Sequence, residues 1–309
     1  SAGAKMAVRP VGCFFGTVGG GLVVAQAILR AAALHARGPG AAERLDMNLT
    51  SDLAAGTDMI CGGRVTLVLE AVGPADAPLW AGLDDSLRRG ETAVLLTRLP
   101  PDAARVAGRS RLPGQGPTEN AGLRDAALAE GGPLLRPDGD GLVLVEPFAP
   151  RPPVYLFGAG HVSQATARVA ALTGFRVIVL DDRAEFANVE RFPEADQVLV
   201  LDDLHHALPE PLESAVPEDC CLVIVTRGHV HDKTVLAQAL RTRARYVGMI
   251  GSRTKRDQVY AALRAEGFTE ADIARCHCPI GLPIGAQTPE EIALSIVAEL
   301  VAVRAGKAS

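Results

Sequence analysis

In the second half of the chain, short apolar runs alternate with longer stretches that mix apolar and polar residues. Each apolar run has four or five residues, a length typical of a buried strand, and the mixed stretches have the length of helices. Strands that alternate with helices form a parallel sheet covered on both faces. The predicted strands cover residues 154–157, 176–180, 197–201, 222–226 and 246–250, and the predicted helices residues 161–173 and 232–242.

A last helix is predicted from residue 289. Thr288 is a good N-cap, Pro289 suits the first helical position, and Glu291 completes a capping box. Ile292 and Ile296 follow at helical spacing, which core packing explains without any ligand.

The first half has a different pattern. Strands are predicted at 5–9, 13–15 and 64–70, and an alanine-rich helix over about 21–38. Residues 100–122 are rich in Pro, Gly, Arg and Asn and predict a loop or an exposed hairpin. This half therefore reads as an α+β domain.

A proline-rich segment separates the halves. Residues 147–153 contain four prolines, which is typical of a stiff connection. We predict an N-terminal α+β domain over 1–147 and a C-terminal Rossmann-like, doubly wound domain over 154–309.

The fold of the second domain is indicated most clearly by a glycine turn. Gly158 and Gly160 follow the strand at 154–157 and precede a helix that begins with His161, where unpaired N–H groups favour a phosphate. Asp181, at the end of the next strand, is placed where such folds bind a ribose hydroxyl. Ser163 replaces the usual third glycine.

The other strand ends also carry polar groups. Because the carboxyl ends of parallel strands share one edge of a sheet, we expect these groups to converge. Their arginines would face one crevice and make paired contacts with a phosphorylated ligand. They are Arg183; Thr226, Arg227 and Gly228; and Gly251, Ser252 and Arg253.

The first half contains two further candidate sites. Gly19, Gly20 and Gly21 precede a predicted helix and form either an anion-binding nest or a tight turn. Cys61, followed by Gly62 and Gly63, has an uncrowded sulfur and is a candidate for soft-metal chemistry.

Composition limits the classes of function. The net charge is −5 and hydrophobic residues make up 48% of the chain, which excludes a basic nucleic-acid binder and indicates a globular protein. No apolar run is long enough to span a membrane, and the N-terminus lacks the pattern of a signal peptide, so we expect a cytoplasmic location.

Other cysteines and histidines have ordinary interpretations. The six cysteines are too irregular for a disulfide framework, and Cys220 and Cys221 fit a strand core. Residues 276–278 supply too few donors for structural zinc. His229, His231 and Asp232 form either a metal site or, more simply, hydrogen-bonded loop groups.

The order of these motifs resembles the XdhC/CoxI family of accessory proteins for molybdenum hydroxylases, over nearly the whole chain. The motifs that carry the resemblance are residues 3–6, 16–21 and 60–63 in the first half and 158–161, 181–183, 226–229, 246–253, 279–282 and 288–292 in the second.

The resemblance implies a chaperone rather than an enzyme. Such proteins bind the molybdenum cofactor, protect it while a terminal sulfido ligand is installed, and insert it into an apo-hydroxylase of the xanthine dehydrogenase or aldehyde oxidoreductase type. It further implies a homodimer, a cysteine desulfurase as a second partner, and a cytosine dinucleotide form of the cofactor as one ligand. Cys61 would lie near molybdenum.

The chain departs from the family pattern twice. The family has a strand before the motif at residues 3–6, so a strand is expected to be missing here. A family glutamate is replaced by Val24, which removes whatever contact that carboxylate makes.

Two other classes of function compete with the chaperone. An NAD(P)-dependent oxidoreductase would use Gly158, Gly160 and Asp181, but the sequence offers no persuasive catalytic acid. A docking module without a small ligand would leave the glycine and arginine motifs unexplained.

Overall fold

The structure is a computed structural model that describes residues 3–10, 12–48 and 63–307. The chain divides into two compact units, Ser1–Pro150 and Arg151–Ser309.

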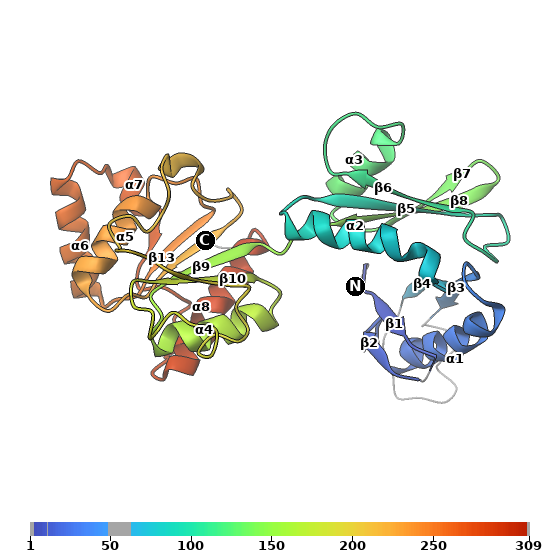
Figure 1. The fold of residues 1–309 in the computed structure, drawn as a ribbon, viewed down its shortest axis with the longest axis horizontal. Helices are drawn as coiled ribbons and strands as arrows, with labels where there is room; N and C mark the ends of the chain where they lie inside the picture. Colours follow the sequence, from blue (N-terminus) through green and yellow to red (C-terminus); the bar gives the residue numbers. More distant parts are fainter. Residues whose placement is uncertain (1–2, 11, 49–62, 308–309) are drawn as a thin grey trace. The chain divides into compact units, whose positions relative to one another are not determined.

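A sheet of six parallel strands forms the centre of the second unit (Figure 1). Its order is β11-β10-β9-β12-β13-β14. From β9 the chain moves outward to β10 and β11, then returns to β12 beside β9 and moves outward in the other direction to β13 and β14. This confirms the predicted α/β fold. The strands are β9 (Pro153–Phe157), β10 (Arg176–Asp181), β11 (Gln197–Val200), β12 (Cys221–Ile224), β13 (Tyr246–Met249) and the unpredicted two-residue strand β14 (Cys276–His277).

Helices cover both faces of this sheet because successive residues of a strand point to opposite faces. Val177 packs with Ala167 and Leu300 on one face, and Ile178 packs with Leu236 on the other. The first face carries α4 (His161–Leu172) and α8 (Pro289–Arg304), and the second carries α5 (His229–Ala239), α6 (Arg253–Ala265) and α7 (Glu270–Ala274).

The predicted helix at 232–242 is wrong by three residues at each end. It begins at His229 because Gly228 is its N-cap, and it ends at Ala239, whose carbonyl accepts a bond from Thr242 Oγ1 at 2.7 Å. The predicted capping box of α8 is confirmed, since Thr288 and Glu291 bond reciprocally.

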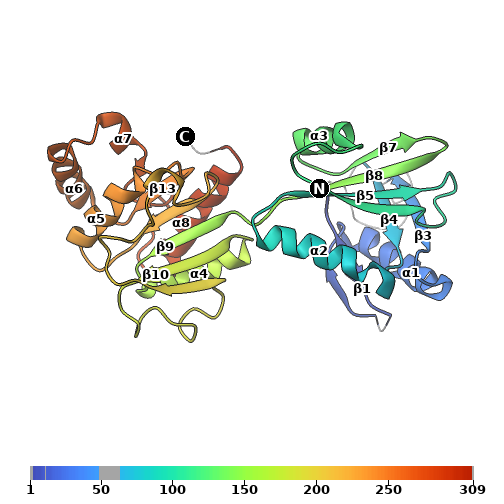
Figure 2. The same ribbon diagram turned by 45° about the horizontal axis from the view of Figure 1, so that its top comes forward.

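An antiparallel sheet of order β6-β5-β8-β7 lies in the first unit, with helices on opposite faces (Figure 2). Leu112 of β6 packs with Ala127 of one helix, whereas the adjacent Arg111 donates to Ser86 of the other helix at 2.8 Å. The strands are β5 (Ala93–Leu99), β6 (Gly108–Pro113), β7 (Leu134–Asp138) and β8 (Gly141–Phe148), and the helices α2 (Ala77–Arg88) and α3 (Ala121–Glu130).

The other elements among the described residues of this unit are two strand pairs, a helix and a short 3₁₀ turn. The segment predicted as a loop or exposed hairpin at 100–122 contains β6, which pairs with β5 and buries Leu112. The remaining elements are β1 (Met6–Val8), β2 (Phe14–Gly16), α1 (Gly21–Arg37), β3 (Ala42–Asn48), β4 (Arg64–Glu70) and the turn Pro74–Asp76.

Candidate functional site

The glycine turn lies at the carboxyl edge of the six-stranded sheet, between β9 and α4. Gly158 has a φ of +106°, and a Cβ atom there would lie 2.5 Å from the carbonyl oxygen of Val225 and 2.9 Å from Cα of Thr226. Only glycine fits this contact. The loops after β9 and β12 therefore touch, as the sequence predicts.

Asp181 connects the glycine turn to the end of β10. Its carboxylate accepts bonds from the backbone N–H of Ala159 at 2.7 Å and from the backbone N–H of Arg183 at 3.0 Å. The Arg183 guanidinium adds two bonds of 2.9 Å. Both carboxylate oxygens are thus occupied and the side chain is 3% exposed, so a ribose hydroxyl would have to displace an internal partner.

Asp182 and Arg227 pair between the loops after β10 and β12. Arg227 makes two bonds to the Asp182 carboxylate, one of them at 2.8 Å, and these hold the pKa of Asp182 at about 2. The Arg227 side chain is 36% exposed and also lies 3.9 Å from Asp181. Arg227 is therefore an accessible cation at this edge.

Arg191 belongs to this cluster, although no sequence motif indicates it. It donates to the Ala159 carbonyl of the glycine turn at 3.4 Å and to Gln164 Oε1 at 3.0 Å. Phe186 lies between two guanidinium groups, with Arg183 at 3.9 Å and Arg191 at 5.0 Å from its ring centre. An aromatic residue followed five positions later by arginine is too common to have indicated this packing.

Two helix starts at this edge lack side-chain caps. Gly160 is the N-cap of α4 and Gly228 that of α5, and a glycine has no side chain to accept from the N–H groups of the first turn. The first residues of the two helices, His161 and His229, are exposed. The unpaired N–H groups of both first turns are suited to an anion.

Ser163 of α4 takes the place of the third glycine. It is fully buried, and its hydroxyl has no hydrogen-bond partner among the described residues. The small side chain thus allows close packing of the helix on the sheet, as predicted.

Thr226, Asp232 and Lys255 form a buried polar network beside these helix starts. The Thr226 hydroxyl and backbone N–H donate to Asp232 Oδ1 at 2.6 and 3.1 Å. Lys255 Nζ pairs with Asp232 Oδ2 and donates to the Ile250 carbonyl at 3.2 Å. Because Asp232 is fully buried and used in this way, it does not form a metal site with His229 and His231.

The predicted residues after β13 lie next to this network, with one exception. Ser252 caps α6 by accepting from the Lys255 backbone N–H at 3.2 Å, and a Cβ at Gly251 would touch the Lys255 side chain. The Arg253 side chain is exposed and has no hydrogen bond or ion pair with the described residues, so its place in the crevice stays a prediction.

The glycine cluster of the first unit forms the start of α1. Gly19 has a φ of +147°, and Gly20 is the N-cap, again without a side-chain bond. Gly21 is the first helical residue, and a Cβ there would meet open space. Gly63 is described, with a φ of +146°, whereas Cys61 and Gly62 lie outside the described residues.

Of the remaining cysteines, Cys13 is exposed and the other four are at least half-buried. Burial raises the pKa of Cys220, Cys221 and Cys276 to about 12 and that of the half-buried Cys278 to about 11. His277 bonds to Glu299 at 2.8 Å instead of joining its neighbouring thiols. Residues 3–10, 12–48 and 63–307 contain no group of three His, Cys, Asp or Glu side chains placed to hold a metal ion.

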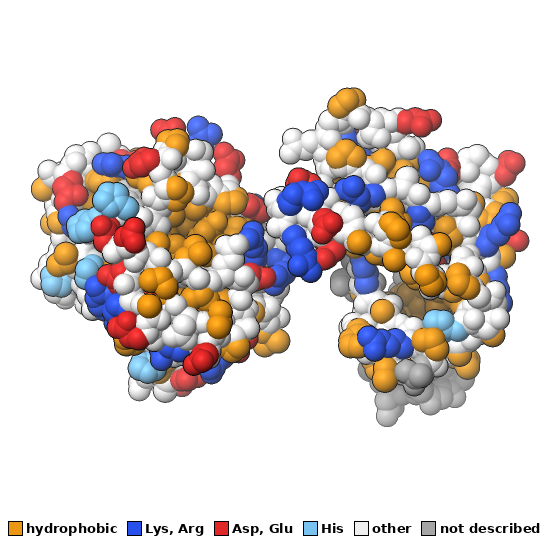
Figure 3. All heavy atoms as spheres, in the orientation of Figure 1, with side chains coloured by type: hydrophobic (Ala, Val, Ile, Leu, Met, Phe, Trp, Pro, Cys, Tyr) orange, Lys and Arg blue, Asp and Glu red, His pale blue; other side chains and the backbone are white. Residues whose placement is uncertain are grey.

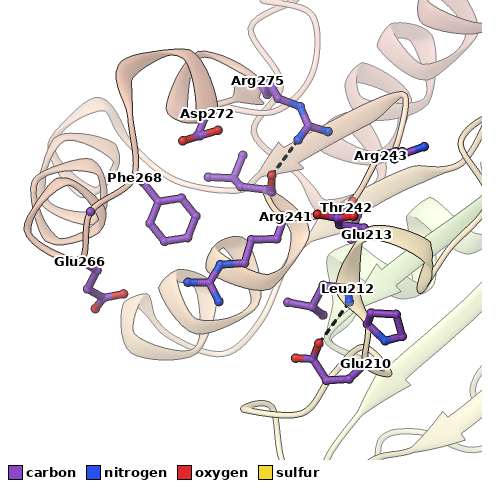
Figure 4. A pocket seen from close by; sticks show the side chains of 13 residues that line it. Glu210, Leu212, Glu213, Arg241, Thr242, Arg243, Glu266, Phe268, Asp272 and Arg275 are labelled. Atoms are coloured by element: carbon purple, nitrogen blue, oxygen red, sulfur yellow. Dashed lines mark hydrogen bonds between the residues drawn. The ribbon is translucent and has the colours of Figure 1, made fainter.

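A pocket of about 630 Å³ lies at the opposite, amino edge of the sheet (Figure 4). It is formed where α5 and α6 end and α7 begins. Arg275 already bonds the Leu240 carbonyl at 2.7 Å. None of the predicted site residues lines it.

The surface of the second unit carries side chains of both charges. On the face of the second unit drawn in Figure 3, acidic and basic side chains are interspersed, without a broad basic area of the kind that binds nucleic acid. Within the described part of the chain, every helix is too short or too polar to cross a bilayer.

Three proteins resemble this chain in sequence. YqeB of Escherichia coli is 36% identical over 52% of the chain, and the match covers 29% of YqeB. A Bacillus subtilis protein described as a probable xanthine dehydrogenase subunit is 28% identical over 98% of the chain and 88% of its own length. The molybdenum cofactor insertion chaperone PaoD of E. coli is 25% identical over 98% and 78%.

The fold has a counterpart among solved structures. A crystal structure described as a xanthine dehydrogenase from Bacillus halodurans superimposes with a TM-score of 0.76 at 21% identity, covering 98% of this chain and 86% of that one. Family profiles match at both ends of the chain: the XdhC Rossmann domain over residues 154–300 and the XdhC and CoxI family over residues 1–46. The chain therefore belongs to the XdhC and CoxI family.

Proposed function

We propose that this protein is a maturation factor that binds the molybdenum cofactor and inserts it into a molybdenum hydroxylase. The name of PaoD and the family support this role. The observation that carries the proposal is the meeting of two uncapped helix starts, at Gly160 and Gly228, with the exposed Arg227. Backbone N–H groups and a guanidinium together suit a phosphate.

The cofactor is cargo in this proposal and is held through its phosphate. The described residues offer no cluster of protein ligands for molybdenum, whereas they offer donors for an anion at the carboxyl edge.

The finer features of this role rest on the family resemblance. They are protection of the cofactor while its sulfido ligand is installed, delivery by a homodimer, and a cysteine desulfurase as the second partner. The cytosine dinucleotide form would place its nucleotide at the same glycine turn. Cys61 and the helix start at Gly20 are proposed to contribute from the first unit.

Retention of the cofactor tests the proposal. Purified protein is mixed with extracted molybdenum cofactor and desalted, and molybdenum content and oxidised-pterin fluorescence are measured, with NAD and NADP titrated in parallel. We expect stoichiometric pterin and molybdenum without nicotinamide binding. Tight NAD(P) binding without pterin would instead establish an oxidoreductase.

A pair of arginine variants locates the site. Arg227→Gln removes the accessible cation and should lower retention about tenfold, since a charge-assisted bond to phosphate contributes about 1.5 kcal/mol or more. Arg243→Gln is the matched control, because Arg243 is an exposed, paired arginine at the amino edge. Equal retention by both variants would remove the carboxyl edge from the site.

A further inference from the structure

Lys255 holds an ammonium group at the carboxyl edge with a donor to spare. Two of its three N–H groups go to Asp232 and to the Ile250 carbonyl, and the third has no acceptor among the described residues. The side chain is 24% exposed, whereas Asp232 is fully buried. The ammonium is thus anchored from the protein side and open on the other.

The Asp232 carboxylate that holds Lys255 is itself held by further hydrogen bonds. Asp232 also accepts two bonds from Thr226, so its carboxylate is held rigidly between the loops after β12 and β13. A buried ion pair adds little net stability compared with an apolar pair of similar volume. Its consequence here is a cation fixed in direction at the end of β13.

The position of Lys255 suits one end of an extended ligand. Lys255 Nζ bonds the carbonyl of Ile250, which follows β13, and β13 is two strands from β9 in the sheet. Neighbouring strands are about 4.8 Å apart, so the ends of β9 and β13 are about 10 Å apart. The route passes the start of α5 at Gly228, in the loop that follows the intervening strand β12. A phosphate at α4 and a second anionic group near Lys255 would span this row.

We propose that Lys255, oriented by Asp232, binds the anionic end of the ligand that lies opposite its phosphate. This inference rests on the proposed function, in which that end carries the oxygen- and sulfur-ligated metal. Thr226 and Asp232 are positioning residues, and Lys255 makes the contact.

The test uses a variant that removes the cation without leaving a buried charge. In the double variant Asp232→Asn/Lys255→Met, both charges are replaced by neutral groups of similar size. The matched control is Lys233→Met, because Lys233 lies on the same helix as Asp232, is exposed to a similar extent at 29%, and pairs with Glu266. Each protein is assayed for retention of the molybdenum cofactor and, by calorimetry, for binding of inorganic pyrophosphate.

We expect the double variant to lose cofactor at least tenfold faster than the wild type and the control, with pyrophosphate affinity changed less than twofold. Unchanged cofactor release would overturn the role of Lys255, and so would an equal loss of affinity for both ligands, which indicates a collapsed edge. Failure of the wild type to retain cofactor would instead overturn the proposed function. Lys255→Arg keeps the charge and should retain the cofactor within about threefold of the wild type; a tenfold loss in this variant would also count against the proposal.

Discussion

Two ion pairs lie along the same edge of the parallel sheet and differ in burial. Asp232 is fully buried and has three donors around it, whereas Asp182 and Arg227 are 16% and 36% exposed. A buried pair cannot exchange its partner for water, but an exposed pair can. The fully buried Asp232 therefore fixes the loops after β12 and β13, whereas the Asp182–Arg227 pair is solvated enough to open.

The largest effect is expected from breaking the buried pair on one side. Lys255→Met leaves the Asp232 carboxylate without its counter-ion and should lower the free energy of unfolding by about 3–5 kcal/mol. Urea denaturation measures the loss. Adding Asp232→Asn should recover most of it, and a double variant as unstable as the single one would contradict the assignment of a buried charge.

A smaller loss is expected from removing one donor to Asp232. Thr226→Val keeps the shape but deletes a 2.6 Å bond to a buried carboxylate, and bonds to charged groups contribute about 1.5–3 kcal/mol. Thr226→Ser keeps the hydroxyl and serves as the control. If both variants unfold at the same urea concentration, the hydroxyl is not the stabilising group.

The smallest effect is expected at the exposed pair, and it depends on pH. Arg227→Gln should lower the free energy of unfolding by less than about 1 kcal/mol at pH 7, because the Asp182–Arg227 pair is partly solvated. The pKa of Asp182 is lowered from 3.8 to about 2, so the pair stabilises the fold above about pH 4, and this contribution is lost as the pH falls toward 2. Thermal unfolding of variant and wild type should therefore differ at pH 6 and converge near pH 2; a constant difference would show that the guanidinium acts through packing.

Local patterns were enough to predict the framework of the second unit. Apolar runs predict the strands. The glycine turn is predictable because the backbone of Val225 lies too close to residue 158 for any side chain, so the position must be glycine. The capping residues Thr288 and Glu291 marked a helix start for a similar local reason.

Contacts between distant residues could not be predicted in the same way. Asp232 and Lys255 are 23 positions apart and meet only because β12 and β13 are neighbours in the sheet. The sequence predicts that Asp181 binds a ribose hydroxyl. In the structure the Arg183 side chain turns back and bonds the Asp181 carboxylate, and the sequence does not indicate this contact. Arg191 reaches the glycine turn from 32 positions away.

Asp182 also acts as an internal competitor for any phosphate that approaches Arg227. An incoming phosphate must displace this carboxylate from Arg227. Breaking the Asp182–Arg227 pair costs free energy, which lowers the net affinity for the phosphate. In the proposed function, Asp182 would pair with the guanidinium again when the ligand leaves, since the two groups are bonded in its absence. Such an edge would favour passing its ligand on over storing it.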